Sequence, residues 1–263
     1  MNNIEFIKIA LKSLGKSHSE AQIFNLSFHG NVTKITEYFI TVNLCKELYE
    51  WNSHNNYPYK IEAEKSTYDF YQNCFECFKL EEKNNIFSKT LFASNYQEYS
   101  KNLSLIRKGK IDIVLSKNTN GYTDIAEYII EVKSVNPTLI KLKQDFLRIQ
   151  NYLSAKIPGF ENSLISGFIV FIKHINTVKK IQSEKELCHE KEVYLNSLSK
   201  HLGGISFEDI THSITTDFIE YSPFENLKLY DENNDFAEIA YNTYSAFSVV
   251  IEIKNTTIGM APT

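Results

Sequence analysis

The chain has 263 residues, of which 43% are hydrophobic and 23% charged, and these proportions are typical of a globular protein. Because only 9 Gly and 5 Pro are present, collagen-like and low-complexity proteins are excluded, and the length suits one large domain or a domain with an appendage. The net charge of −4 is unevenly distributed, because residues 1–100 sum to −2, residues 101–180 to +7 and residues 181–263 to −9. Since the basic side chains are concentrated in the middle block, the near-neutral total does not exclude a nucleic-acid-binding protein.

The N-terminal twenty residues contain no continuous apolar stretch, because Glu5, Lys8 and Lys12 alternate with the apolar positions. A secretory signal requires such a stretch. No window of the sequence approaches the roughly 18 consecutive apolar residues of a membrane span. We therefore expect a cytoplasmic protein with no membrane partner.

Hydrophobic periodicity and turn residues predict the elements in chain order. The first part of the chain is expected to form helices over 3–14, 32–51 and 67–79, and a strand over 59–65. The middle block is expected to form strands over 111–116, 126–134 and 164–173, and an amphipathic helix over 138–155. The last third is expected to form a charged helix over 183–201 and strands near 213–221 and 246–254. Within residues 32–173 the predicted order is helix, three strands, helix, strand, which indicates an α/β protein.

The four cysteines are expected to be reduced thiols, because a long chain without a secretory signal favours a reducing compartment. Cys74 and Cys77 have the ligand spacing of half a zinc site, and Cys188-His189 supplies two further candidate ligands. The favoured interpretation is that these cysteines are unliganded thiols, with Cys74 and Cys77 in an aromatic-rich helix.

Three ionisable residues interrupt the two strands of the middle block. Because strand side chains alternate between faces, Asp112 is on the face of its strand opposite to Ile111, Ile113 and Leu115. Glu131 and Lys133 share one face of the next strand. If the strands pair, Asp112 lies beside Glu131. Two carboxylates so close repel each other, and a divalent cation such as Mg²⁺ between them removes the repulsion. The alternative is a half-exposed strand with ordinary polar residues on its outer face.

Lys133 is expected to act on a water molecule or on the charge of a transition state. A lysine beside a bound cation can orient or deprotonate a water, or stabilise charge that develops on a phosphorus centre. A basic surface is also needed to hold a phosphodiester backbone, and the middle block contains the required side chains. The candidate nucleic-acid-binding residues, chosen for their position near the two strands or on the helix that follows, are Lys108, Lys110, Lys141, Lys143, Gln144 and Arg148.

The segments 109–112 (Gly-Lys-Ile-Asp) and 131–133 (Glu-Val-Lys), followed by an amphipathic helix, resemble the PD-(D/E)xK nuclease superfamily. The resemblance covers roughly residues 31–174 and implies the restriction-endonuclease-like fold, a three-layer α/β/α core with a central mixed sheet. It implies that Asp112, Glu131 and Lys133 are catalytic, and that Asp112 and Glu131 bind Mg²⁺, for which Mn²⁺ can substitute. The Val132 carbonyl and Glu37, an acid on the N-terminal helix at the start of a largely apolar stripe, are further candidate ligands. The alternative for Glu37 is an acid in the first helical turn that the helix dipole favours. The sequence departs from the family pattern at Ile111, where the family often has proline.

The implied function is a Mg²⁺-dependent endonuclease that hydrolyses DNA, with restriction or anti-phage defence as an implied role. RNA or structured DNA is an alternative substrate. A catalytically silent subunit of the same fold, which binds nucleic acid or another protein, is an alternative function. With two arginines in the whole chain, base recognition by arginine is limited, so the sequence preference stays open.

The predicted organisation has an N-terminal helical extension (1–30), the nuclease-like core (31–174) and an acidic C-terminal part (175–263) whose helix and strands pack on the core. This acidic part is expected to support packing, homodimer formation or binding of a partner protein. Glu252-Ile253-Lys254 repeats the Glu-x-Lys spacing of the site. No amphipathic helix follows it, so residues 246–254 are predicted to form a purely structural strand.

Overall fold

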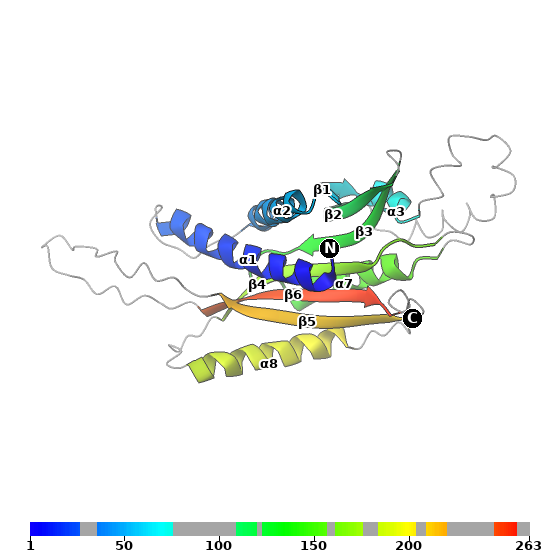
Figure 1. Ribbon diagram of the computed structural model, residues 1–263. Coiled ribbons are helices and arrows are strands. Elements are labelled where there is room, and N and C mark those ends of the chain that lie inside the picture. The colour runs from blue at the N-terminus through cyan, green and yellow to red at the C-terminus, as the bar shows by residue number, and fades with distance from the viewer. Residues whose placement is uncertain are drawn as a thin grey trace, which may run out of the picture.

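The computed structural model describes residues 1–26, 36–75, 109–119, 123–156, 161–175, 184–203, 209–219 and 245–256. Its centre is one six-stranded mixed sheet with the strand order β1-β2-β3-β4-β6-β5 (Figure 1). The strands are β1 (Lys60–Ser66), β2 (Lys110–Thr119), β3 (Thr123–Val132), β4 (Ser166–Ile175), β5 (Ile210–Ile219) and β6 (Ser245–Asn255). The helices are α1 (Asn3–Leu26), α2 (Glu37–His54), α3 (Thr67–Asn73), α7 (Leu139–Ser154) and α8 (Glu184–Leu202).

Among the strand pairs that the structure describes, only one is parallel. β1, β2 and β3 form an antiparallel meander, in which Ile113 lies opposite Ile130. β3 and β4 are parallel, and the segment between them contains α7, as a crossover between parallel strands requires. β6 pairs with β4 and β5 in antiparallel register, so the sheet continues from the middle block into the acidic C-terminal part.

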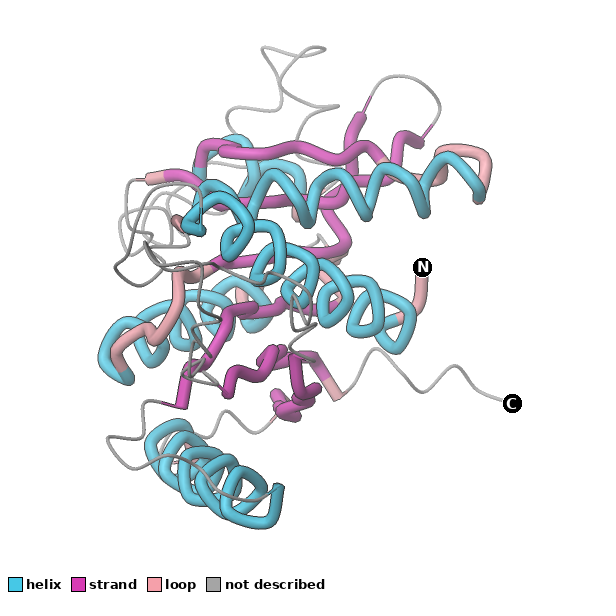
Figure 2. The backbone as a smooth tube through the Cα atoms, turned by 90° about the vertical axis from the view of Figure 1, so that its left-hand side faces the viewer, coloured by secondary structure: helices cyan, strands magenta, loops and turns pink. Residues whose placement is uncertain are grey.

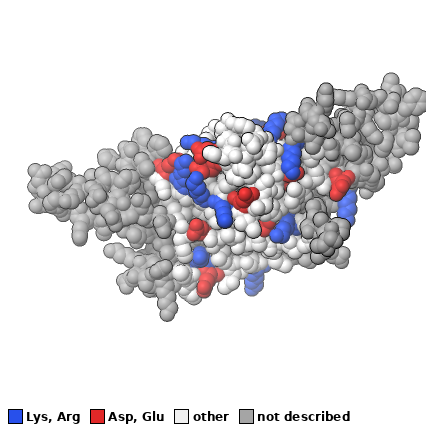
Figure 3. Space-filling view, viewed as in Figure 1, with Lys and Arg blue, Asp and Glu red and all other residues white. Residues whose placement is uncertain are grey.

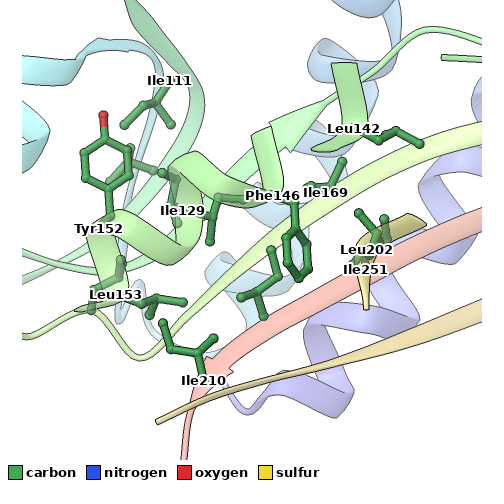
Figure 4. Close-up of a cluster of buried hydrophobic side chains, with 14 of the residues drawn as sticks. Ile111, Ile129, Leu142, Phe146, Tyr152, Leu153, Ile169, Leu202, Ile210 and Ile251 are labelled. Atoms are coloured by element: carbon green, nitrogen blue, oxygen red, sulfur yellow. The ribbon is translucent and has the colours of Figure 1, made fainter. Parts of the chain in front are cut away.

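Helices cover both faces of the sheet, which confirms a mixed α/β architecture with a central mixed sheet flanked by helices (Figure 2). α1 and α2 cover one face, where Phe6 and Leu44 pack on Ile130 and Phe168. α3, α7 and α8 cover the other face. Figure 4 shows this second cluster, in which the α7 side chains Leu142, Phe146, Tyr152 and Leu153 lie against strand residues that include Ile129 and Ile169.

The predicted elements all occur, with shifted ends. The first helix reaches Leu26 rather than residue 14, and the second begins at Glu37, after its N-cap Thr36, rather than at residue 32. Residues 32–35 and 76–79 of the predicted helices lie outside the described residues, and so does Cys77. None of the described helices is long and apolar enough to cross a membrane.

Helix α7 packs tightly against the sheet at Gly167 of β4. A Cβ atom built on Gly167 would lie 2.2 Å from Cγ2 of Ile149 and 2.9 Å from Cγ2 of Ile129, which is closer than side-chain atoms can approach. Glycine is therefore required at this position by the packing of α7 and not by its own backbone conformation.

We expect Gly167→Ala to lower the free energy of unfolding by about 1–3 kcal/mol, because the added methyl group must push α7 away from the sheet. Urea denaturation followed by circular dichroism measures the loss. Gly109→Ala is the matched control, because a Cβ atom at Gly109 meets nothing within 4 Å. Equal stability of the two variants would contradict the close packing of α7 on β4.

Candidate active site

Asp112 and Glu131 lie together where β2 begins and β3 ends. The pairing of Ile113 with Ile130 continues towards them, and the backbone N–H of Val132 donates a hydrogen bond of 2.7 Å to Oδ2 of Asp112. Glu131 is 1% exposed, on the α7 side of the sheet, and the Asp112 carboxylate is 16% exposed. Strand pairing therefore brings the two predicted carboxylates into one buried corner.

Lys133 follows the last residue of β3 and is held in place by its backbone. Its N–H donates to the carbonyl oxygen of Val170 in β4 at 2.9 Å, which extends the parallel pairing by one residue. Its Nζ donates to the carbonyl oxygen of Val132 at 2.9 Å. The Lys133 ammonium is thus fixed at the carboxyl end of β3, with the side chain only 12% exposed.

Four carboxylates surround the Lys133 ammonium. Its Nζ lies 3.4 Å from Oδ2 of Asp145, 3.7 Å from Oε1 of Glu37, 3.7 Å from Oε2 of Glu131 and 3.8 Å from Oδ2 of Asp112. Glu37 comes from the first turn of α2 and Asp145 from the middle of α7, so helices from both faces of the sheet contribute to this corner. The structure therefore brings Glu37, Asp112, Glu131 and Lys133 together.

A second cation, Arg148, completes the cluster from α7. Its Nη2 forms an ion pair of 2.6 Å with Oε2 of Glu131 and donates a hydrogen bond of 2.7 Å to Oδ1 of Asp145. Asp145 was not among the predicted site residues. The available signal was an acid three residues before Arg148 on a largely apolar helix face, a spacing that places the two side chains side by side.

Burial controls the protonation of the carboxyl groups in this cluster. Burial raises the pKa of Glu131 to about 8, although Arg148 opposes the shift. Burial also raises the pKa values of Asp112 and Glu37, with Lys133 as the main opposing charge in each case. Burial by itself would lower the pKa of Lys133, but the surrounding carboxylates, Asp145 first, outweigh it and raise that pKa. Lys133 therefore stays protonated at neutral pH.

The net charge of this cluster and one free acceptor favour a divalent cation, whereas the arrangement of its carboxylates is set by the two cations already present. Four carboxylates against two cations leave a formal charge of −2 when all are ionised, and Oε1 of Glu131 is buried without a hydrogen-bond partner. Carboxylate and carbonyl oxygens are the ligands that Mg²⁺ prefers. In the described part of the chain, no three acidic, histidine or cysteine side chains are arranged to hold a metal ion together. The Lys133 ammonium lies among the carboxylates instead.

The predicted nucleic-acid-binding residues have different environments. Lys141 and Gln144 are exposed on α7, Lys143 is half-buried, and the exposed Lys110 pairs with Glu64 at 2.9 Å. Arg148 faces the carboxylate cluster with 15% of its side chain exposed. Lys108 lies outside the described residues. On the α1 and α2 face, basic and acidic side chains are interspersed (Figure 3).

The second Glu-x-Lys segment has a different environment in β6. The buried Glu252 carboxylate accepts hydrogen bonds from Nδ2 of Asn3 and from Oγ of Ser213, and Nζ of Lys254 lies 3.6 Å from it. These contacts join α1, β5 and β6, and β6 confirms that the predicted strand at residues 246–254 is formed. Cys45, Cys74 and Cys188 are free thiols, and Cys74 is buried.

The fold and the site define a mixed α/β protein with a half-buried cluster of acids and bases at the carboxyl end of a central strand. Comparisons with protein-family models, with curated proteins and with solved structures find no match to this chain.

Proposed function

We propose that this protein is a metal-dependent nuclease that hydrolyses phosphodiester bonds, with DNA as the first candidate substrate. The observation that carries the proposal is the position of the Lys133 ammonium, within 3.8 Å of carboxylates from the paired strands β2 and β3. A cation beside two carboxylates at a strand end is the arrangement that the resemblance to PD-(D/E)xK nucleases implies. The order α2, β1, β2, β3, α7, β4 also matches the implied core, with α3 inserted after β1.

Asp112, Glu131 and Glu37 are the side chains that would hold Mg²⁺, with the Val132 carbonyl as a further oxygen ligand. When bound, the metal would supply Lewis-acid stabilisation of the phosphate and a more acidic water. Lys133 carries a raised pKa, so it acts as a fixed positive charge and hydrogen-bond donor and not as a general base. It would orient the attacking water or stabilise charge on the phosphate oxygens.

A catalytically silent binding subunit is the second candidate function. The observation that favours it is the contact of 2.6 Å between Arg148 and Oε2 of Glu131, which engages an oxygen that a metal would need. Under this alternative, Lys133 and Arg148 occupy the acids permanently in place of a metal, and the protein binds nucleic acid without cleaving it.

Cleavage of plasmid DNA, single-stranded DNA and RNA in Mg²⁺, in Mn²⁺ and in EDTA tests the proposal. We expect cleavage that requires the metal and is lost in Asp112→Asn, because that change removes the charge of a metal ligand but keeps its shape. Asp217→Asn, on the exposed face of β5, is the matched control and should cleave like the wild type. Binding without cleavage of any substrate would favour the silent subunit, and equal cleavage by wild type and Asp112→Asn would contradict the site.

A further inference from the structure

Arg148 is held by two carboxylates through a single nitrogen. Nη2 forms a close ion pair of 2.6 Å with Oε2 of Glu131 and donates a charge-assisted hydrogen bond of 2.7 Å to Oδ1 of Asp145. Arg148 is the cation nearest to the Glu131 carboxylate, because Nζ of Lys133 is 3.7 Å from Oε2, and Oε1 has no hydrogen-bond partner. The guanidinium therefore takes the position beside Glu131 that a metal cation would take.

The remaining contacts of Arg148 are those of a side chain that can leave Glu131. Its Nε is buried without a hydrogen-bond partner, so the guanidinium is incompletely satisfied where it lies. The side chain is 15% exposed, whereas the Glu131 side chain is 1% exposed, so Arg148 forms the solvent side of the contact. Asp145 lies one helical turn before it on α7 and can keep the guanidinium after Glu131 is released.

We propose that Arg148 is a latch on the metal site, which occupies Glu131 in the metal-free protein and is displaced to Asp145 when a divalent cation binds. This inference rests on the proposed function and adds a regulation of the same site. Without the latch, four carboxylates would face one ammonium in a half-buried corner, and their mutual repulsion would be larger. The latch therefore keeps the empty site folded, and metal must compete with it for Oε2 of Glu131.

Isothermal titration of the whole protein with Mn²⁺, without nucleic acid, tests the latch. Arg148→Lys keeps the positive charge, but its Nζ lies one bond closer to the backbone than Nη2 of arginine and falls short of Glu131, so we expect about tenfold tighter binding than in the wild type. Arg148→Gln should bind at least as tightly as Arg148→Lys. Lys141→Gln is the control for charge alone, because Lys141 lies near Glu37 on the exposed side of α7 without touching Glu131.

The outcomes separate the latch from the nuclease proposal. Equal Mn²⁺ affinity of the wild type and Arg148→Lys, or a gain in Arg148→Gln no larger than that in Lys141→Gln, would overturn the latch. If the latch is overturned but the wild type still cleaves nucleic acid, the nuclease proposal is unaffected. Absence of Mn²⁺ binding and of cleavage in every variant would overturn both proposals. Metal binding that occurs only in the Arg148 variants would support the latch. Circular dichroism confirms that each variant is folded before titration.

Discussion

Replacement of Lys133 by methionine is expected to slow metal-dependent cleavage by about 10²–10³-fold, the usual loss when one preorganised electrostatic contact to a transition state is removed. Methionine has a similar length but no charge, so the variant loses the ammonium that lies 3.4–3.8 Å from four carboxylates. Removal of a competing cation should leave metal binding intact or tighten it. Single-turnover cleavage of a labelled DNA and titration with Mn²⁺ measure the two effects separately.

Lys254→Met is the matched control for Lys133→Met. Lys254 has the same Glu-x-Lys spacing in β6, but its side chain is 48% exposed and its glutamate is already bonded to Asn3 and Ser213. We expect this variant to cleave at the wild-type rate. If Lys133→Met cleaved DNA at the wild-type rate, Lys133 would have no part in the chemistry. Its ammonium would then have only a structural role.

The second large effect is expected in the stability of the metal-free protein when Glu131 is replaced by glutamine. Burial raises the pKa of Glu131 from an ordinary value of 4.5 to about 8. The folded state therefore binds more protons than the unfolded state between these two pH values. Stability of the wild type must fall as the pH rises through this window, because the unfolded state releases its proton first. Glu131→Gln removes this contribution, so its advantage over the wild type should grow with pH.

Thermal unfolding in EDTA between pH 5 and pH 9 measures this effect. We expect the variant to unfold a few degrees above the wild type at pH 8.5, since about 1 kcal/mol corresponds to about 2–4 °C for a chain of this size. The difference should shrink towards pH 5. Glu252→Gln is the control, because the Glu252 carboxylate accepts two side-chain hydrogen bonds and its replacement should bring no gain. If the unfolding temperatures of the wild type and of Glu131→Gln changed in parallel with pH, this result would contradict an unfavourable charge on the buried Glu131 side chain.

The charged pair of strands could be predicted from sequence because strand alternation is a local rule. Asp112 and Glu131 stand out as acids in apolar strands, and their pairing needs only a hairpin between them. The same rule is wrong for Ile111, which was expected to share a face with Ile113 and Leu115 but packs in the α7 cluster. The β1–β2 pairing is interrupted next to it, because no pair is formed at Glu64, which has a φ of 56°.

The helical contributions to the site could be predicted only in part. Glu37 was proposed because it is an acid at the start of an apolar helix stripe, but its distance to Lys133 depends on how α2 lies across the sheet. The position of the Asp145–Arg148 pair beside Glu131 depends on how α7 is rotated about its own axis. No local sequence pattern predicts this rotation. The position of β6 between β4 and β5 is also non-local, because the last of the described strands lies inside the sheet.

Gly167 connects the apolar packing of the molecule to its charged corner. Ile149, the residue that would collide with a larger side chain at position 167, is the immediate neighbour of Arg148 on α7. Any change that lifts this helix by about 1 Å would stretch the contact between Arg148 and Glu131 beyond hydrogen-bond range. The absence of a side chain at Gly167 therefore sets the distance between Arg148 and Glu131, although Gly167 contacts neither residue. Changes in the packing of this part of the core should also change the affinity of the site for metal.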